Sequence, residues 1–422
     1  MADENILSDD LLRQLISVGE VDIVVGLATH NNAKTAGHVA QMIRAGLLQY
    51  FPRQRAVVLN VDAGSRDGTR ELVQAAAIGD VRDPMAAQSL RTMRCISVRQ
   101  PDGRSRGLQA IVESGELLRA RACAILSPES SVTPDWIDRL LRPIYSGDFD
   151  FISPIYRRNA FDGILITNLL YPVIRALYSQ KLREPHPSDF SFSGKFGTHL
   201  AGLDLWRREF GAVGSEICFT AAAIAGGFRI QQTFLGPRGH VEHQSADLVP
   251  AMQETLGALF WSLDQDFAVW SNGDGTKAVP TIGPDYELTV EPVRVNRKRL
   301  FQMFSSAVPN LEPVLRSILT PETHEELRRC VGAREETCHF SDELWAKTVY
   351  EFAASNHRNV ISRNHIIQAL APLYRGRVHT FLAQNRGASE NQVEETIEKL
   401  CKTFEMLKPH LLELWTKQEG GS

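Results

Sequence analysis

Two apolar runs near the start of the chain, VDIVVGLA at residues 21–28 and AVVLNV at 56–61, each end in small and polar residues. THNN follows the first run at 29–32, and DAGSRDGT follows the second at 62–69. Between them, residues 35–50 place apolar side chains on one helical face, at Val39, Met42, Ile43 and Leu47. The order strand, amphipathic helix, strand predicts a βαβ unit, and therefore a parallel sheet with functional loops at the carboxyl ends of its strands.

Composition limits the class of protein and its partners. The net charge of -4 over 422 residues gives no electrostatic reason to expect nucleic acid. The six cysteines stand far apart, so buried free thiols in a reducing compartment are expected rather than a metal cluster or disulfides. The N-terminus, MADEN, is acidic where a signal peptide is basic, and the most apolar window, residues 164–178, is shorter than a membrane span. We therefore expect a soluble, cytoplasmic protein.

The pattern along the chain predicts two domains with short additions at the ends. Residues 1–20 read as a lead-in helix and residues 21–250 as an α/β domain. Beyond about residue 250 one amphipathic pattern follows another, which predicts a helical C-terminal domain over residues 251–419. Residues 420–422, Gly-Gly-Ser, are expected to form a flexible tail.

Two stretches of the α/β domain show no clear period. Residues 101–107 are polar and are expected to form a loop before a helix at 108–118. Residues 185–202 are rich in Gly, Ser, His and Phe and are expected to form a long loop. Long loops in compact domains are more often functional than not.

Polar residues follow four of the apolar runs, at 29–32, 62–65, 103–107 and 127–130. In a parallel sheet these segments would converge along one edge, which is the expected ligand site. There Asp62 could accept hydrogen bonds from a base or ribose, while Arg104 and Arg106 could offset phosphate charge. The alternatives are an ordinary turn at Asp62 and two solvated surface arginines.

Four segments, in the same order, resemble motifs of known enzymes. DAGSRDGT at 62–69 is similar to the Asp-x-Gly-Ser-x-Asp-Gly-Thr segment of GT-A nucleotide-sugar glycosyltransferases. GSEI at 214–217 and LGPRGH at 235–240 resemble Gly-Val-Glu-Ile and Leu-Gly-x-x-Ala-His of glucosyl-3-phosphoglycerate synthases. GRS at 103–105 stands where these enzymes and the mannosylglycerate synthases carry Gly-Lys-Gly. The resemblance covers residues 21–252 and implies a GT-A fold: a Rossmann-like, mostly parallel sheet flanked by helices, with an all-helical C-terminal part.

The resemblance also implies a divalent metal, Mg²⁺ or Mn²⁺, but the metal motif is altered. The family's Asp-x-Asp falls on Ser127, Pro128 and Glu129, so a serine replaces the first carboxylate. Glu129 can still supply a hard oxygen ligand, and His240 stands in the position of the family's metal-binding histidine. A metal-independent or inactive site, an ordinary loop histidine at 240, and His243 as the ligand are the alternatives.

By the same resemblance, the donor nucleotide sugar is expected to be bound by residues at the ends of the strands. These residues are Ala28, Thr29, His30, Asn32, Asp62, Gly103, Arg104, Arg106, Ser127, Pro128 and Glu129. The donor would be a GDP- or UDP-hexose, because the sequence does not distinguish the two bases.

Glu216 is the candidate catalytic residue. In the resembling enzymes the matching glutamate lies by the transferred sugar and the acceptor, so sugar hydroxyl binding is favoured over general-base work. The alternative is a purely structural acidic residue at a helix start, where the helix dipole favours it. The branch resembled is retaining, and the departing phosphate is thought to assist the attack, so no dedicated base is expected.

The acceptor is expected to meet the segment 186–199, which includes Asp189. Lys195, with Gly197 and Thr198 close by, is suited to a carboxylate or phosphate on the acceptor, because a point charge and an accessible backbone occur together. A flexible surface lysine is the alternative. Glycerate and 3-phosphoglycerate are suggested by the resemblance alone.

These observations predict a retaining glycosyltransferase that moves a hexose from a nucleotide diphosphate sugar to a small polar, anionic acceptor. The resembling enzymes also suggest a homodimer. The alternative is a nucleotide-sugar-binding protein that has lost catalysis, because Ser127 replaces a metal ligand. An NAD-dependent dehydrogenase is disfavoured because no Gly-x-Gly-x-x-Gly follows the first strand.

Overall fold

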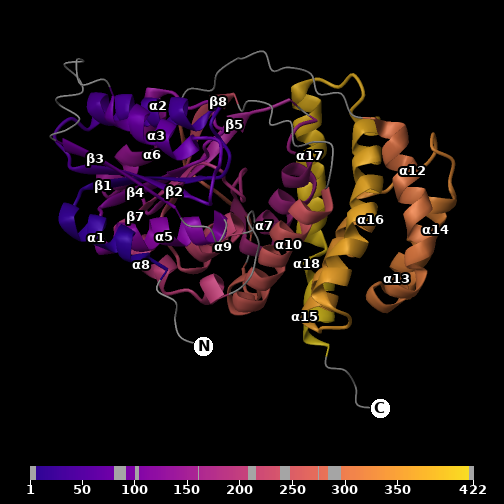
Figure 1. Cartoon of the computed structure of the whole chain (residues 1–422). Helices are drawn as coiled ribbons and strands as arrows, with labels where there is room; N and C mark the ends of the chain where they lie inside the picture. The colour runs from indigo at the N-terminus through magenta and orange to yellow at the C-terminus, as the bar shows by residue number, and fades with distance from the viewer. Residues whose placement is uncertain are drawn as a thin grey trace. The chain divides into compact units, whose positions relative to one another are not determined.

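The computed structural model describes two compact units. It covers residues 6–79, 92–99, 104–159, 161–207, 215–237, 248–273, 275–283 and 296–417. The sheet unit comprises Met1–Arg157, His186–Val241 and Val279–Thr289. The helical unit comprises Arg158–Pro185, Glu242–Ala278 and Val290–Ser422 (Figure 1).

The sheet unit is built on an eight-stranded sheet within the described part of the chain, in the order β10-β8-β5-β7-β4-β1-β2-β3. Its strands are β1 (Ile23–Thr29), β2 (Ala56–Asp62), β3 (Met93–Arg99), β4 (Ala122–Leu126), β5 (Phe151–Arg157), β7 (Phe190–Ser193), β8 (Ile230–Pro237) and β10 (Thr281–Ile282). All neighbours pair in parallel except β7, which is antiparallel to β4 and β5. The mostly parallel sheet flanked by helices confirms the predicted α/β fold class.

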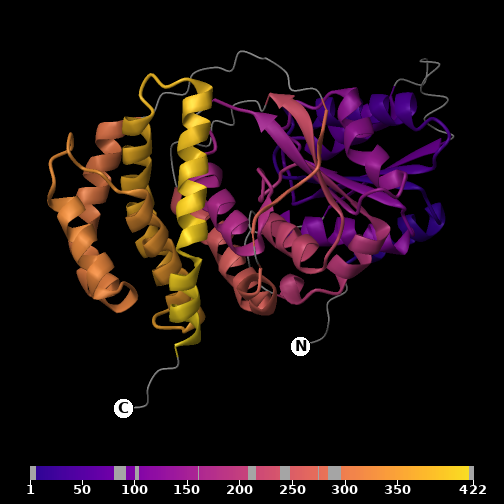
Figure 2. The ribbon, with the colours of Figure 1, turned by 180° about the vertical axis from the view of Figure 1, so that it is seen from behind.

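Helices cover both faces of this sheet. They are α1 (Asp9–Val18), α2 (Ala36–Tyr50), α3 (Thr69–Ile78), α5 (Arg104–Leu117), α6 (Pro134–Tyr145), α8 (Gly194–Ala201) and α9 (Ser215–Ala225), with a 3₁₀ turn at Asp204–Arg207. The helices α2, α3 and α6 lie on one face and α5, α8 and α9 on the other, as both views show (Figures 1 and 2).

The central strand β1 explains this two-sided arrangement, because successive side chains of a strand point to opposite faces. Ile23, Val25 and Leu27 are fully buried in the core beneath α2, α3 and α6. On the other face Gly26 lets α5 approach closely, since a Cβ added at Gly26 would lie 2.4 Å from Cγ2 of Ile111. The continuous apolar run at residues 21–28 thus fits a strand that is covered on both faces.

Two predictions of loop structure are wrong. Residues 104–107, expected to be loop, form the first turn of α5. Their sequence, Arg-Ser-Arg-Gly, has no apolar side chain from which a helical period could be recognised. Residues 185–202, expected to form one long loop, contain β7 and α8. The strand β7 is only four residues long, which is too short for a period to emerge from the sequence.

The helical unit contains α7 (Tyr171–Tyr178), α10 (Leu248–Gln265), α11 (Phe267–Ser271), α12 (Arg297–Ala307), α13 (Glu312–Ile318), α14 (Pro321–Gly332), α15 (Asp342–His357), α16 (Arg363–Gln384), α17 (Glu390–Met406) and α18 (Lys408–Thr416). A π-helical turn at Ile166–Leu170 and a 3₁₀ turn at Val308–Leu311 join them, and β6 (Gln180–Lys181) pairs with β9 (Lys277–Ala278). Helices therefore dominate the C-terminal part, as predicted, although β9 and β10 interrupt them.

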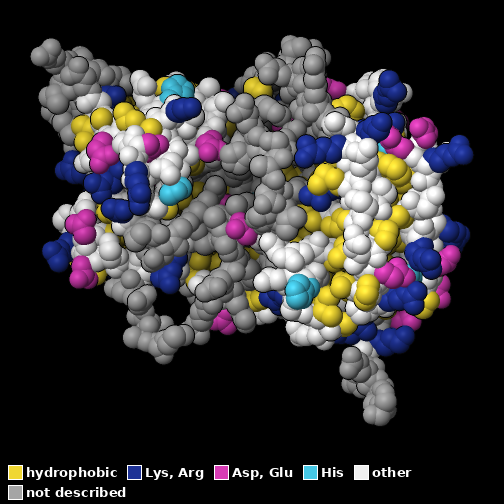
Figure 3. Space-filling model, turned by 45° about the vertical axis from the view of Figure 1, so that its right-hand side comes forward, with side chains coloured by type: hydrophobic (Ala, Val, Ile, Leu, Met, Phe, Trp, Pro, Cys, Tyr) yellow, Lys and Arg dark blue, Asp and Glu magenta, His cyan; other side chains and the backbone are white. Residues whose placement is uncertain are grey.

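The core of the helical unit is rich in aromatic side chains, and two of their buried polar atoms donate hydrogen bonds to distant backbone carbonyl groups. Nε1 of Trp345 donates to the carbonyl oxygen of Asn168 at 2.7 Å, and the Tyr350 hydroxyl donates to that of Phe404 at 2.8 Å. Each helix that the structure describes is too short or too polar to cross a membrane. The face of the molecule seen in Figure 3 carries basic side chains interspersed with acidic ones over its described residues.

Candidate functional site

Asp62, at the end of β2, shapes the turn that follows it. Its carboxylate is buried, with the residue 2% exposed. Oδ2 accepts the backbone N–H groups of Gly64 at 3.1 Å and Ser65 at 2.8 Å, while Oδ1 accepts the Ser65 hydroxyl and lies 2.9 Å from the Thr29 hydroxyl. Gly64 has φ +87°, which only glycine adopts without strain. The carboxylate therefore fixes the backbone of residues 62–65 at the end of the sheet.

The loops after β1 and β2 are joined by further hydrogen bonds. The backbone N–H of Asn31 donates to Oγ of Ser65 at 2.8 Å, and Oδ1 of Asn31 accepts the N–H of Arg66 at 3.1 Å. Nδ1 of His30 lies 3.1 Å from the carbonyl oxygen of Ala63, and its Nε2 lies 3.0 Å from Nδ2 of Asn31. A neutral imidazole with its proton on Nδ1 satisfies both contacts. The two loops thus form one ordered surface.

Asp67 and Thr69 extend this surface along the same edge. The Asp67 carboxylate accepts the backbone N–H of Ala33 at 3.0 Å and that of Thr69 at 3.1 Å, together with the Thr69 hydroxyl. These hydrogen bonds, that of the hydroxyl first, lower the pKa of Asp67. Oγ1 of Thr69 also accepts the N–H of Asn32 at 2.8 Å. The acidic residue in the second half of the DAGSRDGT segment therefore ties helix α3 to the loop after β1.

The loop after β4 joins the same cluster through Glu129. Nδ2 of Asn32 donates to Oε1 of Glu129 at 3.0 Å, and the Glu129 side chain is exposed. The backbone N–H of Glu129 donates to Oγ of Ser127 at 3.3 Å, so the serine that stands in the metal motif caps its own turn. Three loops predicted to converge at the carboxyl ends of β1, β2 and β4 are thus in contact.

Asp189 stabilises the loop after β4 through hydrogen bonds to its carboxylate. It is 0% exposed, and its carboxylate accepts the N–H of Ser127 at 2.8 Å, the Ser130 hydroxyl at 2.7 Å and the Tyr156 hydroxyl. The antiparallel pairing of β7 with β4 brings it there, since Phe190 lies opposite Ile125. Asp189 is therefore a buried support of the loop after β4, a role that the sequence did not predict. Tyr156 carried no sequence signal at all.

The first turn of α5 lies against the ends of β1 and β2. A Cβ added at Gly107 would lie 3.4 Å from Cβ of Ala28 and 3.7 Å from Cγ1 of Val61. Arg104 begins the helix and Arg106 lies in its first turn, half-buried. A helix N-terminus carries a partial positive charge and unpaired N–H groups, which suit an anion. Gly103 lies outside the described residues.

Glu216 lies in the first turn of α9 and is 1% exposed. Phe219 contacts the ring of Phe190, at 5.5 Å between ring centroids, near the carboxyl end of β4. Phe228, which follows α9, contacts Phe196 at 4.6 Å at the opposite end. The helix therefore runs back across the sheet, and its first turn lies toward the same edge as the three loops.

The structure does not bring the predicted acceptor residues to that edge. Lys195, Gly197 and Thr198 lie in α8, which starts where β7 ends, beside the amino end of β4. The N–H of Gly194 donates to the carbonyl oxygen of Arg121 at 3.1 Å, just before β4 begins. The ammonium of Lys195 lies 5.4 Å from the centre of the Phe228 ring. Because β7 runs antiparallel, these residues lie at the opposite edge of the sheet.

The possible metal ligands at the three contacting loops could hold only a cation that takes its remaining ligands from water or substrate. Within the described residues, no group of three or more His, Cys, Asp or Glu side chains is arranged to hold a metal ion. Glu129 offers a single exposed carboxylate, and His240 and His243 lie outside the described residues. Mg²⁺ commonly takes one or two carboxylates together with water and substrate phosphates, and Glu129 fits that pattern.

No protein-family model matches the chain, and a search of curated proteins found no significant match. Solved structures with partial similarity include complexes of glucosyl-3-phosphoglycerate synthase from Mycobacterium tuberculosis. Its complex with phosphoglyceric acid is 16% identical, with a TM-score of 0.41 over 63% of this chain and 85% of that one. Its complex with Mn²⁺, uridine diphosphate and glucosyl-3-phosphoglycerate is 17% identical, with a TM-score of 0.41 over 63% and 86%.

Proposed function

We propose that the sheet unit is a nucleotide-sugar-dependent hexosyltransferase whose donor site lies at the carboxyl ends of β1, β2 and β4. The observation that carries the proposal is the hydrogen-bonded contact of three strand-end loops, with Glu129 at their meeting point beside Asn32. Ligands of open parallel sheets bind at this edge. The DAGSRDGT segment, which resembles the donor-binding motif of GT-A enzymes, forms one of these loops.

Each part of the donor would meet a different element. Thr29, His30 and the turn held by Asp62 would face the base and ribose, mainly through backbone atoms. The N-terminus of α5, with Arg104 and Arg106, would bind the diphosphate. Glu129 and His240 would hold Mg²⁺ or Mn²⁺, and the bound metal would offset the charge of the leaving diphosphate.

The reaction would join an acceptor hydroxyl oxygen to the anomeric carbon of the hexose. The bond from that carbon to the diphosphate oxygen breaks, the nucleoside diphosphate leaves, and the hydroxyl proton passes to the departing phosphate. Glu216 would bind hydroxyl groups of the hexose or acceptor and orient them for retention of configuration. The acceptor would be a small hydroxy acid of the glycerate or 3-phosphoglycerate type. We further propose that the enzyme is a homodimer and acts in the cytoplasm.

One observation favours a second candidate, a donor-binding protein without turnover. Ser127 replaces the first carboxylate of the metal motif, and its hydroxyl accepts the N–H of Glu129 within its own turn. With one carboxylate fewer, diphosphate charge would be offset less in the transition state than in an enzyme with the intact motif. This candidate predicts donor binding with neither transfer nor donor hydrolysis.

The deciding experiment is calorimetric titration of the full chain with UDP and GDP, each with and without Mn²⁺, for the wild type and Glu129→Gln. The glutamine can still accept the Asn32 hydrogen bond, so the substitution removes charge while keeping the loop contact. We expect metal-dependent nucleotide binding that Glu129→Gln weakens by at least about tenfold. Glu116→Gln, an exposed glutamate on α5, is the matched control and should bind as the wild type does.

Turnover assays with UDP- and GDP-hexoses and glycerate or 3-phosphoglycerate then separate the two candidates. Hexose transfer supports the enzyme, whereas binding without transfer or hydrolysis supports the second candidate. Failure of both nucleotides to bind would refute both.

A further inference from the structure

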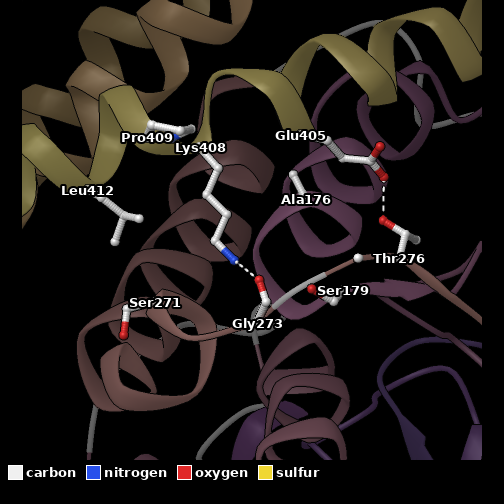
Figure 4. Close-up of a pocket in the computed structure, with 10 residues that line it drawn as sticks. Ala176, Ser179, Ser271, Gly273, Thr276, Glu405, Lys408, Pro409 and Leu412 are labelled. Carbon is white, nitrogen blue, oxygen red and sulfur yellow. Dashed lines mark hydrogen bonds between the residues drawn. The ribbon is translucent and has the colours of Figure 1, made fainter.

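A cavity of about 340 Å³ lies wholly within the helical unit, remote in sequence from the motifs of the sheet unit. It forms where the end of α7, the segment after α11 and the break between α17 and α18 meet. Figure 4 shows the Lys408 side chain reaching from the start of α18 to Gly273, with Leu412 and Ser271 on one side and Glu405 and Thr276 on the other. Its volume suits a small ligand.

The charged side chains of this cavity are held in place by neighbours. Oε1 of Glu405 accepts Nε of Arg175 at 2.8 Å and also the Thr276 hydroxyl. Nζ of Lys408 donates to the carbonyl oxygen of Gly273 at 2.8 Å. Because both side chains are fixed before any ligand arrives, less conformational entropy is lost on binding.

Hydrogen-bonding atoms remain for a ligand. Oε2 of Glu405 and the hydroxyls of Ser179 and Ser271 have no hydrogen-bond partner among the described residues. A carboxylate oxygen only accepts, whereas a serine hydroxyl both donates and accepts. Ala176, Pro409 and Leu412 add apolar wall. The lining thus combines acceptors, donors and a hydrocarbon surface.

Among the described residues, the lining carries one acidic and one basic side chain, Glu405 and Lys408. Their charges are opposite, and Glu405 is already paired with Arg175, so the lining has no excess charge of one sign to select an anion or a cation. A neutral molecule with several hydroxyl groups can donate to the carboxylate, exchange hydrogen bonds with the serines and lay its C–H groups on the apolar wall. We propose that this cavity binds a neutral polyol of mono- or disaccharide size, at a site separate from the proposed donor site.

The test is binding of glucose, trehalose and myo-inositol to the full chain, followed by calorimetry and by saturation-transfer NMR. We expect saturable binding of at least one of them, with a Kd on the order of 1 mM. Leu412→Trp, which fills the cavity, should weaken it by at least about tenfold, and Ser271→Ala by about threefold. Met406→Trp, at a neighbouring residue that is 71% exposed, is the matched control and should leave binding unchanged.

Circular dichroism on each variant checks that the fold is kept, and Ser271→Ala decides the matter if Leu412→Trp does not fold. The proposal is overturned if no neutral polyol binds saturably, or if Ser271→Ala and a folded Leu412→Trp bind as the wild type does. Preferential binding of acetate or of glycine betaine, which is zwitterionic, would also overturn it.

Discussion

Two acidic side chains of the sheet unit, Asp62 and Asp189, are held differently from the acidic partners of two arginines in the helical unit. In the sheet unit, Asp62 and Asp189 are satisfied by hydroxyls and backbone N–H groups close to the strand ends. In the helical unit, Arg175 binds Glu398 and Glu405, and the buried Arg377 binds Asp342 at 2.7 Å. Backbone donors are local and directional, so they fix a loop. Ion pairs link side chains far apart in the sequence, so they join helices.

Within the helical unit, the pKa values of two carboxyl groups differ according to their hydrogen-bond donors. The Arg175 guanidinium lowers the pKa of Glu398 to about 2, because its hydrogen bonds favour the ionised carboxylate. Asp266 has a single neutral donor, the Tyr178 hydroxyl at 2.8 Å, and burial raises its pKa to about 6. The ionised form is thus favoured at Glu398, which has a cationic partner, and disfavoured at Asp266, whose hydrogen-bond donor is a neutral hydroxyl.

The largest expected effect comes from removing a buried cation. Arg377→Met should lower the free energy of unfolding by about 3–5 kcal/mol, because it leaves the partly buried Asp342 carboxylate without its cation and the buried oxygen atoms of Asn168 and Phe340 without a donor. Urea denaturation measures the loss. Adding Asp342→Asn to Arg377→Met should recover part of it, whereas Arg328→Met, at an exposed arginine, should change stability little. A loss below about 1 kcal/mol for Arg377→Met would show that this pair does not hold the helices together.

A smaller effect is expected at the loop support of the sheet unit. Asp189→Asn keeps one acceptor for the Ser127 N–H but weakens its bonds to the hydroxyls, so we expect a loss of about 1–3 kcal/mol. It should also weaken nucleotide binding, because Glu129 lies on the loop that Asp189 supports. Denaturation and calorimetry measure the two effects, with exposed Asp9→Asn as the control. If Asp189→Asn is destabilised but binds nucleotide as the wild type does, the loop that Asp189 supports is not needed for nucleotide binding.

The smallest expected effect is an increase in the free energy of unfolding. Asp266→Asn should stabilise the chain by roughly 1–2 kcal/mol at pH 7, after allowance for solvent screening. The pKa of Asp266 is higher in the folded state, about 6, than the ordinary 3.8, so its ionisation destabilises the fold as pH rises through that window. The advantage of Asp266→Asn should therefore vanish below about pH 4. Denaturation midpoints of both proteins from pH 4 to 7 test this, and an equal difference at every pH would contradict it.

Much of the sheet unit could be predicted from local pattern. The apolar runs at residues 21–28 and 56–61 predicted β1 and β2, and the apolar face of residues 35–50 predicted α2. Because parallel strands present their carboxyl ends at one edge, the contact of the three strand-end loops followed from the same pattern. The buried support of Asp189 did not, because it depends on a strand of four residues that runs the other way.

The sequence by itself determined the alternation of strands and helices, the order of the loops that carry Thr29, Asp62 and Glu129, and the helical character of the C-terminal part. Only the tertiary structure decided that Lys195 lies at the far edge of the sheet, and that Arg175 binds Glu398 more than 200 residues later. Periodicity reports which face of an element is buried. The direction of a short strand and the partner of a buried charge depend on segments distant in the chain, which no local pattern records.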